Sequence, residues 1–375
     1  MTAIAPPADR SCRVSWTLTA YLARHFLRRF FMVFGGLMAV TTLVTAVEML
    51  DQIAGKPHAT TLIALEMALL KLPHLAQEIM PFILLFAAMA SLWRIARSRE
   101  LVVARAAGVS VWQILAPPVG VAIVIGIFTT TLLNPLAAVL LKRQERLHAH
   151  YTSYEPASFA VAATGLWLRQ VHDGDATIIH AREVTQNGAS LRDVTMFRFE
   201  GQDTFKSRLD AARAQLADGH WLLEDITVYR PGEVSERIAQ RRIKTSLTPT
   251  EIYHSFAPPE TISFWALPDF IAVMAKAGFT AEPQKLQYHR LLSMPVLLAA
   301  MTLLAAAFTL QSHRYGHVAL LIASGVLTGV GVHVMSNLVF AIGLGSRLPV
   351  AIAAWAPAAA TLMLALAALL YLEDG

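Results

Sequence analysis

The most distinctive charged residues of the chain form a short polar stretch between two long apolar runs. Residues 95–110 have the sequence IARSRELVVARAAGVS. Ser98 is a favourable N-cap, Glu100 would complement the dipole of the first helical turn, and Gly108 suits the left-handed position after the last turn. These residues predict a helix of about two turns, with Ser110 as the cap of the next helix.

This short helix offers a docking surface that combines charge with apolar side chains. Leu101, Val102 and several alanines form its apolar face, and Glu100 and the arginines supply its charge. Helices of this composition also lie on membrane surfaces, held by anionic lipids, and the residues alone leave that alternative open. The candidate docking residues are Arg97, Arg99, Glu100, Leu101, Arg105 and Gly108.

Compact catalytic and metal-binding motifs are absent from the sequence. Residues 54–60, AGKPHAT, contain a Gly-Lys pair but lack the upstream glycine and the following Ser or Thr of a P-loop. Neither H-E-x-x-H nor G-x-S-x-G occurs, and the thirteen histidines lack metal-ligand spacing. Because Cys12 is the one cysteine, no intrachain disulfide can form. We expect no ATP hydrolysis, metal site or cofactor in this chain.

The elements that must position the charged stretch are membrane helices. The chain of 375 residues is 55% hydrophobic and 15% charged, and its mean hydropathy is +0.49. This composition predicts several membrane spans. About 20 apolar residues are needed to cross the hydrocarbon core, and two groups of three runs are long enough. They cover residues 30–50, 76–93 with an apolar approach from 62, 114–141, 289–310, 318–344 and 348–370.

The arginines near the ends of the spans predict the orientation. They cluster before the first span, between the second and third spans, and at Arg314 between the fourth and fifth. All three segments fall on one side if the spans alternate, and the positive-inside rule makes that side cytoplasmic. Both termini and the stretch 95–110 would then be cytoplasmic, and the middle segment external.

The middle segment, residues 142–288, has the pattern of β-structure. Asp173-Gly174, Asn187-Gly188 and Asp218-Gly219 are hairpin-type turns that separate β-rich runs. Short strands at this spacing predict a sandwich or jelly roll. The expected organisation is an N-terminal transmembrane half over 1–145, with the charged helix near 98–108, a β domain over 146–265 and a C-terminal transmembrane half over 266–375.

Several motifs together resemble the LptF/LptG family of lipopolysaccharide export permeases. They are SRELVVARAAGVS at 98–110, EIMPF at 78–82, MLDQI at 49–53, LPH at 72–74 and GLWLR at 165–169. The agreement extends over most of the chain, and MLDQI, SRELVV and GLWLR look more like LptG than LptF. The resemblance implies a polytopic α-helical membrane protein with six transmembrane helices, three before and three after an inserted periplasmic β-jelly-roll domain.

The resemblance also implies the partners and the site of action. Family members pair as a heterodimer, here with an LptF-like second permease, on an LptB-like ABC ATPase dimer that uses ATP and Mg²⁺. They extract lipopolysaccharide from the bacterial inner membrane and pass it to LptC- and LptA-like periplasmic bridge proteins. In that setting residues 98–108 would be the coupling helix that docks on the ATPase, with Glu100 foremost. The resemblance implies no nucleic-acid partner.

Lipopolysaccharide carries phosphorylated sugars, so its site requires cations at the outer interface of the membrane. The expected substrate-binding residues are Lys142, Arg143, Arg146, Lys56, Lys71 and His74. The cluster at 142–146 is the strongest, whereas basic residues at helix ends often contact lipid head groups only. His74 and Glu48 stand where the resemblance implies basic residues, and Lys71 would supply the missing cation.

Two other functional classes remain open from the residues alone. One is a membrane enzyme acting on a lipid-linked envelope precursor, in which acidic residues of the spans would be catalytic. The other is an ion-driven transporter with Glu66 or Glu78 as a proton site. The sequence shows neither a clustered catalytic constellation nor an inverted repeat to support them.

Overall fold

The computed structural model describes most of the chain. The described residues are 16–53, 60–98, 100, 103, 106, 108–152, 158–162, 165–172, 175–185, 190–200, 204–217, 219–245, 258–276, 281–312, 318–344 and 349–374. Lys56, Arg99, Leu101 and Arg105, which the sequence marks as site residues, lie outside them.

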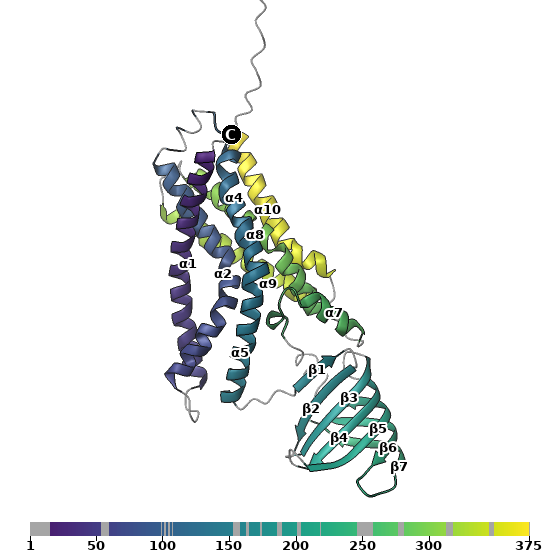
Figure 1. Ribbon diagram of the computed structural model, residues 1–375. Coiled ribbons are helices and arrows are strands. Elements are labelled where there is room, and N and C mark those ends of the chain that lie inside the picture. Colours follow the sequence, from purple (N-terminus) through teal and green to yellow (C-terminus); the bar gives the residue numbers. More distant parts are fainter. Residues whose placement is uncertain are drawn as a thin grey trace, which may run out of the picture. The chain divides into compact units, whose positions relative to one another are not determined.

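Six helical segments are long and apolar enough to cross a membrane (Figure 1). They are α1 (Trp16–Ile53), α2 (Thr61–Arg97), a third segment made of α4 (Val111–Phe128), the π-helix η1 (Thr129–Leu133) and α5 (Asn134–Thr152), then α8 (Glu282–Ser312), α9 (Val318–Leu344) and α10 (Val350–Asp374). The predicted arrangement of three spans, an insertion and three further spans is confirmed.

Several helices are longer than the apolar runs that predicted them. The 38 residues of α1 extend about 57 Å at 1.5 Å per residue, well beyond the roughly 30 Å of a hydrocarbon core. Its first turns contain Leu, Ala and Arg, all good helix formers, so the helix continues through the charged residues that mark the predicted membrane edge. Hydropathy therefore located the spans but not the helix ends.

The chain divides into two compact units. The first contains Met1–Glu48, Lys71–Asn134 and His289–Gly375, and the second contains Met49–Leu70 and Pro135–Tyr288. In the first unit, the apolar windows of α2 and α8 are 61% and 67% buried, against 11% for α1 and 17% for α9. The centre of this unit is therefore α2 and α8, while α1 and α9 present broad apolar faces outward.

The third span is held closely against α8 where it changes from α-helix to π-helix. A Cβ atom at Gly126 would lie 2.5 Å from the Cα atom of Pro295, so the two backbones meet with no room for a side chain. The hydroxyl of Thr130 donates to the carbonyl of Leu291 over 3.0 Å, and both groups are buried. Glycine and a threonine hydroxyl thus fix this span on its neighbour.

The second unit contains the inserted β domain, which confirms the β-structure predicted from the turn dipeptides. Its strands form one antiparallel seven-stranded sheet in consecutive order. The φ angle of Gly219 is +76°, as a tight turn requires, whereas Gly174 and Gly188 lie outside the described residues. The strands are β1 (Ser158–Ala162), β2 (Gly165–His172), β3 (Asp175–Thr185), β4 (Ser190–Glu200), β5 (Thr204–Ala217), β6 (His220–Tyr229) and β7 (Glu236–Lys244).

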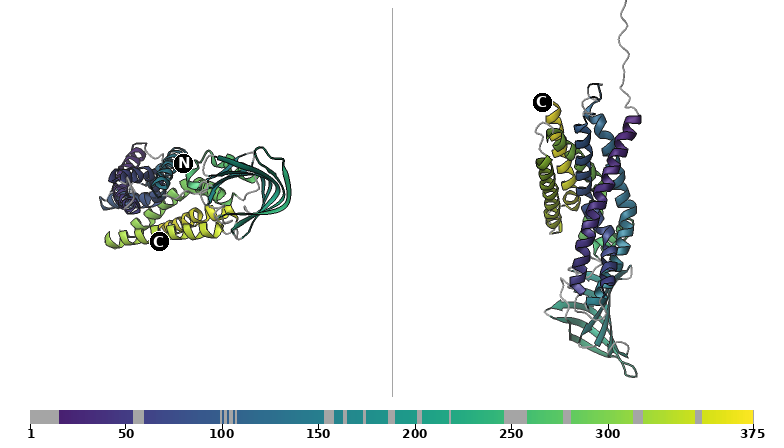
Figure 2. Two further views of the ribbon diagram at one scale, coloured as in Figure 1. Left: turned by 90° about the horizontal axis from the view of Figure 1, so that it is seen from below. Right: turned by 90° about the vertical axis from the view of Figure 1, so that its left-hand side faces the viewer.

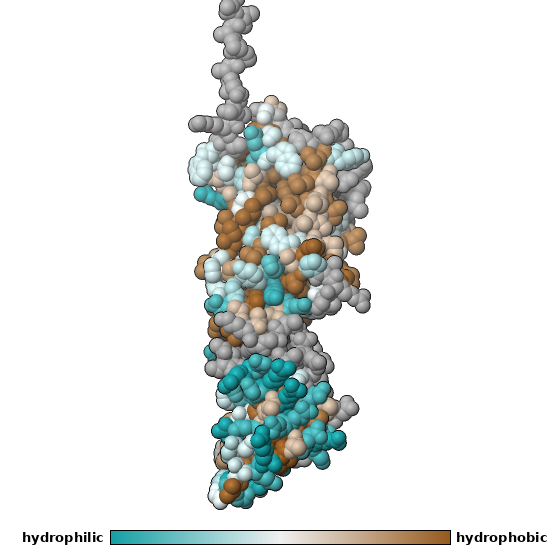
Figure 3. Space-filling model, turned by 90° about the vertical axis from the view of Figure 1, so that its right-hand side faces the viewer, coloured by the Kyte–Doolittle hydropathy of each residue, from teal (hydrophilic) through white to brown (hydrophobic). Residues whose placement is uncertain are grey.

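The sheet curls so that its concave side encloses an apolar core (Figure 2, left). Trp221 and aliphatic side chains from β2 to β7 are buried there, and Met274 of α7 (Leu267–Lys276) joins the same core. Space-filling colouring shows the contrast between the two kinds of structure. On the face drawn in Figure 3, hydrophobic residues cover much of the helical surface and hydrophilic residues cover most of the sheet.

A crease across the sheet produces part of this curl. At one level, four adjacent strands each expose two consecutive residues: 182–183, 192–193, 212–213 and 224–225. Asp193 and Asp225 adopt positive φ angles of 50° and 53° there. The side-chain alternation shifts by one residue at the crease, as at a β-bulge. Apolar residues therefore face inward on both sides of it.

The contact at Gly126 yields the first prediction. Replacement of Gly126 by Ala should destabilise the purified protein by about 1–3 kcal/mol, because the new methyl group meets the backbone of Pro295. The thermal unfolding of the full chain in detergent measures this effect. Gly120→Ala on the same helix is the matched control, since a Cβ atom there has no neighbour within 4 Å. Equal stability of the two variants would contradict the packing.

The crease yields the second prediction. Asp193→Val should loosen β4 by about 1–3 kcal/mol, because a β-branched residue is strained at positive φ. In Asp193→Gly the amide hydrogens of β4 should exchange as fast as in the unmutated protein, because glycine tolerates this conformation. The exposed ion pair of Asp193 with Arg182, at 3.7 Å, contributes little to stability. Amide hydrogen exchange of β4 in the full chain is the measurement. Similar amide exchange rates of β4 in the Val and Gly variants would show that the positive φ angle at residue 193 does not strain a β-branched side chain.

Candidate functional site

The charged stretch connects α2 to α4. A serine at each junction forms hydrogen bonds with the end of the adjoining helix. The Ser98 amide donates to the Arg94 carbonyl over 2.9 Å, and the Ser98 hydroxyl donates to the Ile95 carbonyl over 3.1 Å. Ser98, predicted to begin the short helix, is thus bonded back to the last turn of α2. At the other end, Ser110 and Gln113 form the reciprocal bonds of a capping box. The predicted cap of α4 is confirmed.

Between these ends, the described residues agree with a short helix. Glu100, Val103 and Ala106 are helical, and Gly108 has a φ angle of +85°. Only glycine adopts that conformation at low cost, as the sequence predicted for the residue after the last turn. We call residues 98–110 the connector.

Two of the predicted docking residues have defined contacts. The phenol of Tyr21 on α1 donates to Oε2 of Glu100 over 3.2 Å. The guanidinium carbon of Arg97 lies 5.2 Å from the ring centroid of Trp93, within range of a cation–π interaction. Glu100 is therefore already in contact with another helix of its own chain, through a tyrosine that the sequence did not single out.

The basic residues of α5 lie in the second unit and are not equivalent. Nη2 of Arg143 lies 2.9 Å from Oε1 of Glu66 on α2, so this cation is paired. Lys142 and Arg146 are exposed, one helical turn apart, and form no ion pair with a carboxylate among the described residues. His148 adds a second tie, with its Nε2 atom 2.9 Å from Oε1 of Gln52 at the end of α1.

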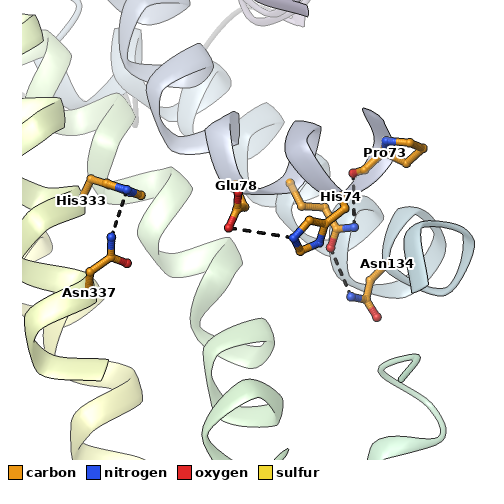
Figure 4. A network of polar contacts seen from close by, with 7 residues as sticks. Pro73, His74, Glu78, Asn134, His333 and Asn337 are labelled. Atoms are coloured by element: carbon orange, nitrogen blue, oxygen red, sulfur yellow. Dashed lines mark hydrogen bonds and ion pairs between the residues drawn. The ribbon is translucent and has the colours of Figure 1, made fainter. Parts of the chain in front are cut away.

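Lys71 and His74 lie in the first unit, on α2. Lys71 is half-buried, and Nε2 of His74 lies 4.0 Å from Oε1 of Glu78, one helical turn further along (Figure 4). The neighbouring Gln77 accepts a hydrogen bond from the amide of Asn134 over 3.2 Å. Of the predicted substrate residues that the structure describes, Lys142, Arg143 and Arg146 thus belong to the second unit, and Lys71 and His74 belong to the first.

A second polar pair, missed in the sequence, lies on α9. Asn337 and His333 are one turn apart and hydrogen-bonded over 3.1 Å (Figure 4). The ring of His333 lies 5.7 Å from that of Phe82, one turn from Glu78 on α2. A Cβ atom at Gly329 would come within 2.8 Å of Phe82, so the two helices pack closely there. The i, i+4 spacing of His and Asn in an apolar run was the available signal.

Arg290 is a further cation that the sequence did not identify. It lies in α8, and its guanidinium carbon is 5.7 Å from the ring centroid of Phe340 on α9. Among the described residues it forms no ion pair with a carboxylate. It is the second residue of the predicted span 289–310, and a cation at the end of a membrane helix is common.

The described interior of the β domain is apolar, so its inner side presents no group of cations like the one on α5. On the outer face, Arg208 lies between the rings of Phe197 and Tyr229, at 5.8 and 5.7 Å. A hydrogen bond with Asp210 raises the pKa of Arg208 above its usual value, and its partial burial opposes the rise. This guanidinium stays charged at every physiological pH, and its contacts are structural.

The comparisons with known proteins agree with this architecture. Residues 20–372 match the family described as lipopolysaccharide export system permease LptF/LptG. The chain is 21% identical, over 327 residues, to the lipopolysaccharide export system permease protein LptG of Haemophilus influenzae. That alignment covers 86% of this chain and 89% of the relative. The expected family is confirmed, and the LptG-like motifs fit this relative.

Family membership also sets the class of protein. The family is one of transport permeases, so the chain is a transport subunit and not itself an enzyme. Six candidate spans together with the family indicate a multi-pass protein of the inner membrane. The family match over residues 20–372, with which the six candidate spans and the inserted sheet are consistent, leads to one conclusion: this chain belongs to the LptF/LptG family of lipopolysaccharide export permeases.

Proposed function

We propose that this chain is the LptG-type permease of an ABC transporter that extracts lipopolysaccharide from the inner membrane. In this role it pairs with an LptF-like permease, and an LptB-like ATPase dimer hydrolyses ATP with Mg²⁺. LptC- and LptA-like proteins receive the lipid on the periplasmic side, where the β domain lies. The family match supports the permease role, and the missing P-loop supports a separate ATPase.

The connector is the feature that most supports a partner ATPase as the source of energy for this permease. It joins α2 and α4, and a serine at each junction is hydrogen-bonded to the adjoining helix end, so a displacement of the connector displaces two spans. Its described helical residues are exposed, and they include Glu100. An exposed, charged helix fixed between two rigid spans suits a groove on a cytoplasmic ATPase. The arginines around it support the cytoplasmic side for the connector and both termini.

The lipid phosphates are assigned to Lys142 and Arg146 of α5, which form no ion pair with a carboxylate in the part of the chain that the structure describes. Lys142 and Arg146 are exposed and one turn apart, whereas Arg143 would have to leave Glu66 before it could bind a phosphate. Charge-assisted hydrogen bonds to phosphate are the strong ones, so two such cations provide a specific contact. On α2, Lys71 and His74 are the secondary candidates, and Lys56 is kept as a candidate from the sequence.

Reversal of the charge at Glu100 tests the partner. Glu100→Lys should reduce the ATPase that co-purifies with this chain from native membranes by about tenfold or more, because a docking carboxylate would become a cation. The second permease should remain bound. Quantitative mass spectrometry of the purified complex is the measurement.

The matched control is Glu233→Lys, which makes the same charge change at an exposed residue of the β domain. It should retain the ATPase. Recovery of neither a second permease nor an ATPase with the unmutated chain would reject the transporter assignment. Full retention of the ATPase by Glu100→Lys would reject the role of Glu100 alone.

Removal of the α5 cations tests the substrate site. The double variant Lys142→Gln/Arg146→Gln should retain about tenfold less lipopolysaccharide on purification, because two phosphate contacts are lost. Phosphate analysis of the lipid bound per protein is the measurement. The control Arg192→Gln/Arg213→Gln removes two exposed cations at the crease of the sheet and should retain the lipid. Equal losses in the two double variants would point to net charge, and not to a site on α5.

A further inference from the structure

Glu100, the residue proposed above to dock on the ATPase, is hydrogen-bonded within its own chain to Tyr21 of α1. We propose that Tyr21 is a positioning residue that ties the connector to α1, so that movement of the connector is transmitted to α1 as well as to α2 and α4. This inference rests on the proposed function, because it assigns a route to the force that a partner ATPase would supply.

The first support is the chemistry of the contact. A carboxylate has two oxygens and can accept about four hydrogen bonds. The Tyr21 phenol uses Oε2, so Oε1 can still accept from an arginine or lysine of a docking partner. Tyr21 and a partner can therefore hold the same carboxylate at once. A bond from a neutral donor to a charged acceptor is also stronger than a neutral pair.

The second support is the apolar packing at the same level of the bundle. Leu22 of α1 is buried together with Ile95 of α2 and Ile114 of α4, and Leu18 and Val109 pack against this cluster. The helices on both sides of the connector, and Val109 within it, thus pack against the part of α1 that carries Tyr21. The hydrogen bond and this small cluster together form a direct link between the connector and α1.

The third support is the surroundings of the Tyr21 ring. His25, one turn along α1, stacks on it with a centroid distance of 6.2 Å and an interplanar angle of 22°. Nε2 of His25 is buried and has no hydrogen-bond partner among the described residues. Arg94 of α2 is near enough to interact electrostatically with both rings. The ring is therefore oriented by neighbours on α1 and α2, with its hydroxyl on Glu100.

The position of α1 makes the link consequential. Its apolar window is the least buried of the six spans, so α1 can shift or tilt with less repacking than α2 or α8. Tyr21 lies about one and a half turns before Phe26 and about two and a half turns before Phe30, and both phenylalanines are buried in the main core of the first unit. A pull at Tyr21 thus acts on the end of a helix that is anchored further along.

A double-mutant cycle tests the link in the reconstituted transporter. The variants are Tyr21→Phe, Glu100→Gln and both together, and the readout is lipopolysaccharide transported per ATP hydrolysed. Tyr21→Phe removes only the hydroxyl. It should lower this ratio by about three- to tenfold while the amount of bound ATPase changes less than about twofold. In the Glu100→Gln background the same substitution should change the ratio less than it does in the unmutated chain, because the phenol there donates to a neutral amide oxygen and no longer to a carboxylate.

The control and the outcomes separate this inference from the proposed function. Tyr371→Phe, which alters an exposed tyrosine of α10, should leave the ratio unchanged. An unmutated chain that retains no ATPase would overturn the proposed function and this inference together. An unmutated chain that retains ATPase, combined with no effect of Tyr21→Phe or with equal effects in both backgrounds, would overturn this inference alone. Loss of bound ATPase in Tyr21→Phe equal to the loss of transport would also overturn it.

Discussion

Inside a bilayer every backbone amide and carbonyl must find its hydrogen-bond partner within the protein, and the rest of this structure depends on that constraint. It makes the spans continuous helices, and it explains the threonines where the third span becomes a π-helix. The hydroxyls of Thr129 and Thr131 return to the carbonyls of Ile125 and Ile127, four residues back. The hydroxyl of Thr130 instead crosses to α8. At the π-helix, threonine hydroxyls therefore donate to backbone carbonyls in a part of the chain where no water would be expected to do so.

The sequence predicts the parts of the fold that depend on local composition. Apolar runs located all six spans, turn dipeptides located the β domain, and Gly108 and Ser110 had the conformations their types predicted. Features that depend on neighbours in space were not predictable. The crease of the sheet requires four strands to shift alternation at one level, and no single strand reveals that Asp193 and Asp225 lie in line.

The candidate site shows the same limit. Residue type identified Lys142, Arg143 and Arg146 as equivalent cations, yet Arg143 is paired with Glu66, which is distant in sequence. Charge alone marked Glu100, but its contact with Tyr21 depends on how α1 lies against the connector. A sequence states which charges exist, whereas the fold decides which of them remain available to a ligand.

The capping of α2 and α4 has an evolutionary consequence. Ser98 bonds back to the last turn of α2 and Ser110 caps α4, so the two ends of the connector supply terminal hydrogen bonds to the two helices. Substitutions at exposed residues between them, such as Val103 and Ala106, therefore cost the membrane part of the protein little, whereas Glu100 and Val109 contact other helices. These exposed positions can therefore diverge among related permeases while the helices on either side keep their structure.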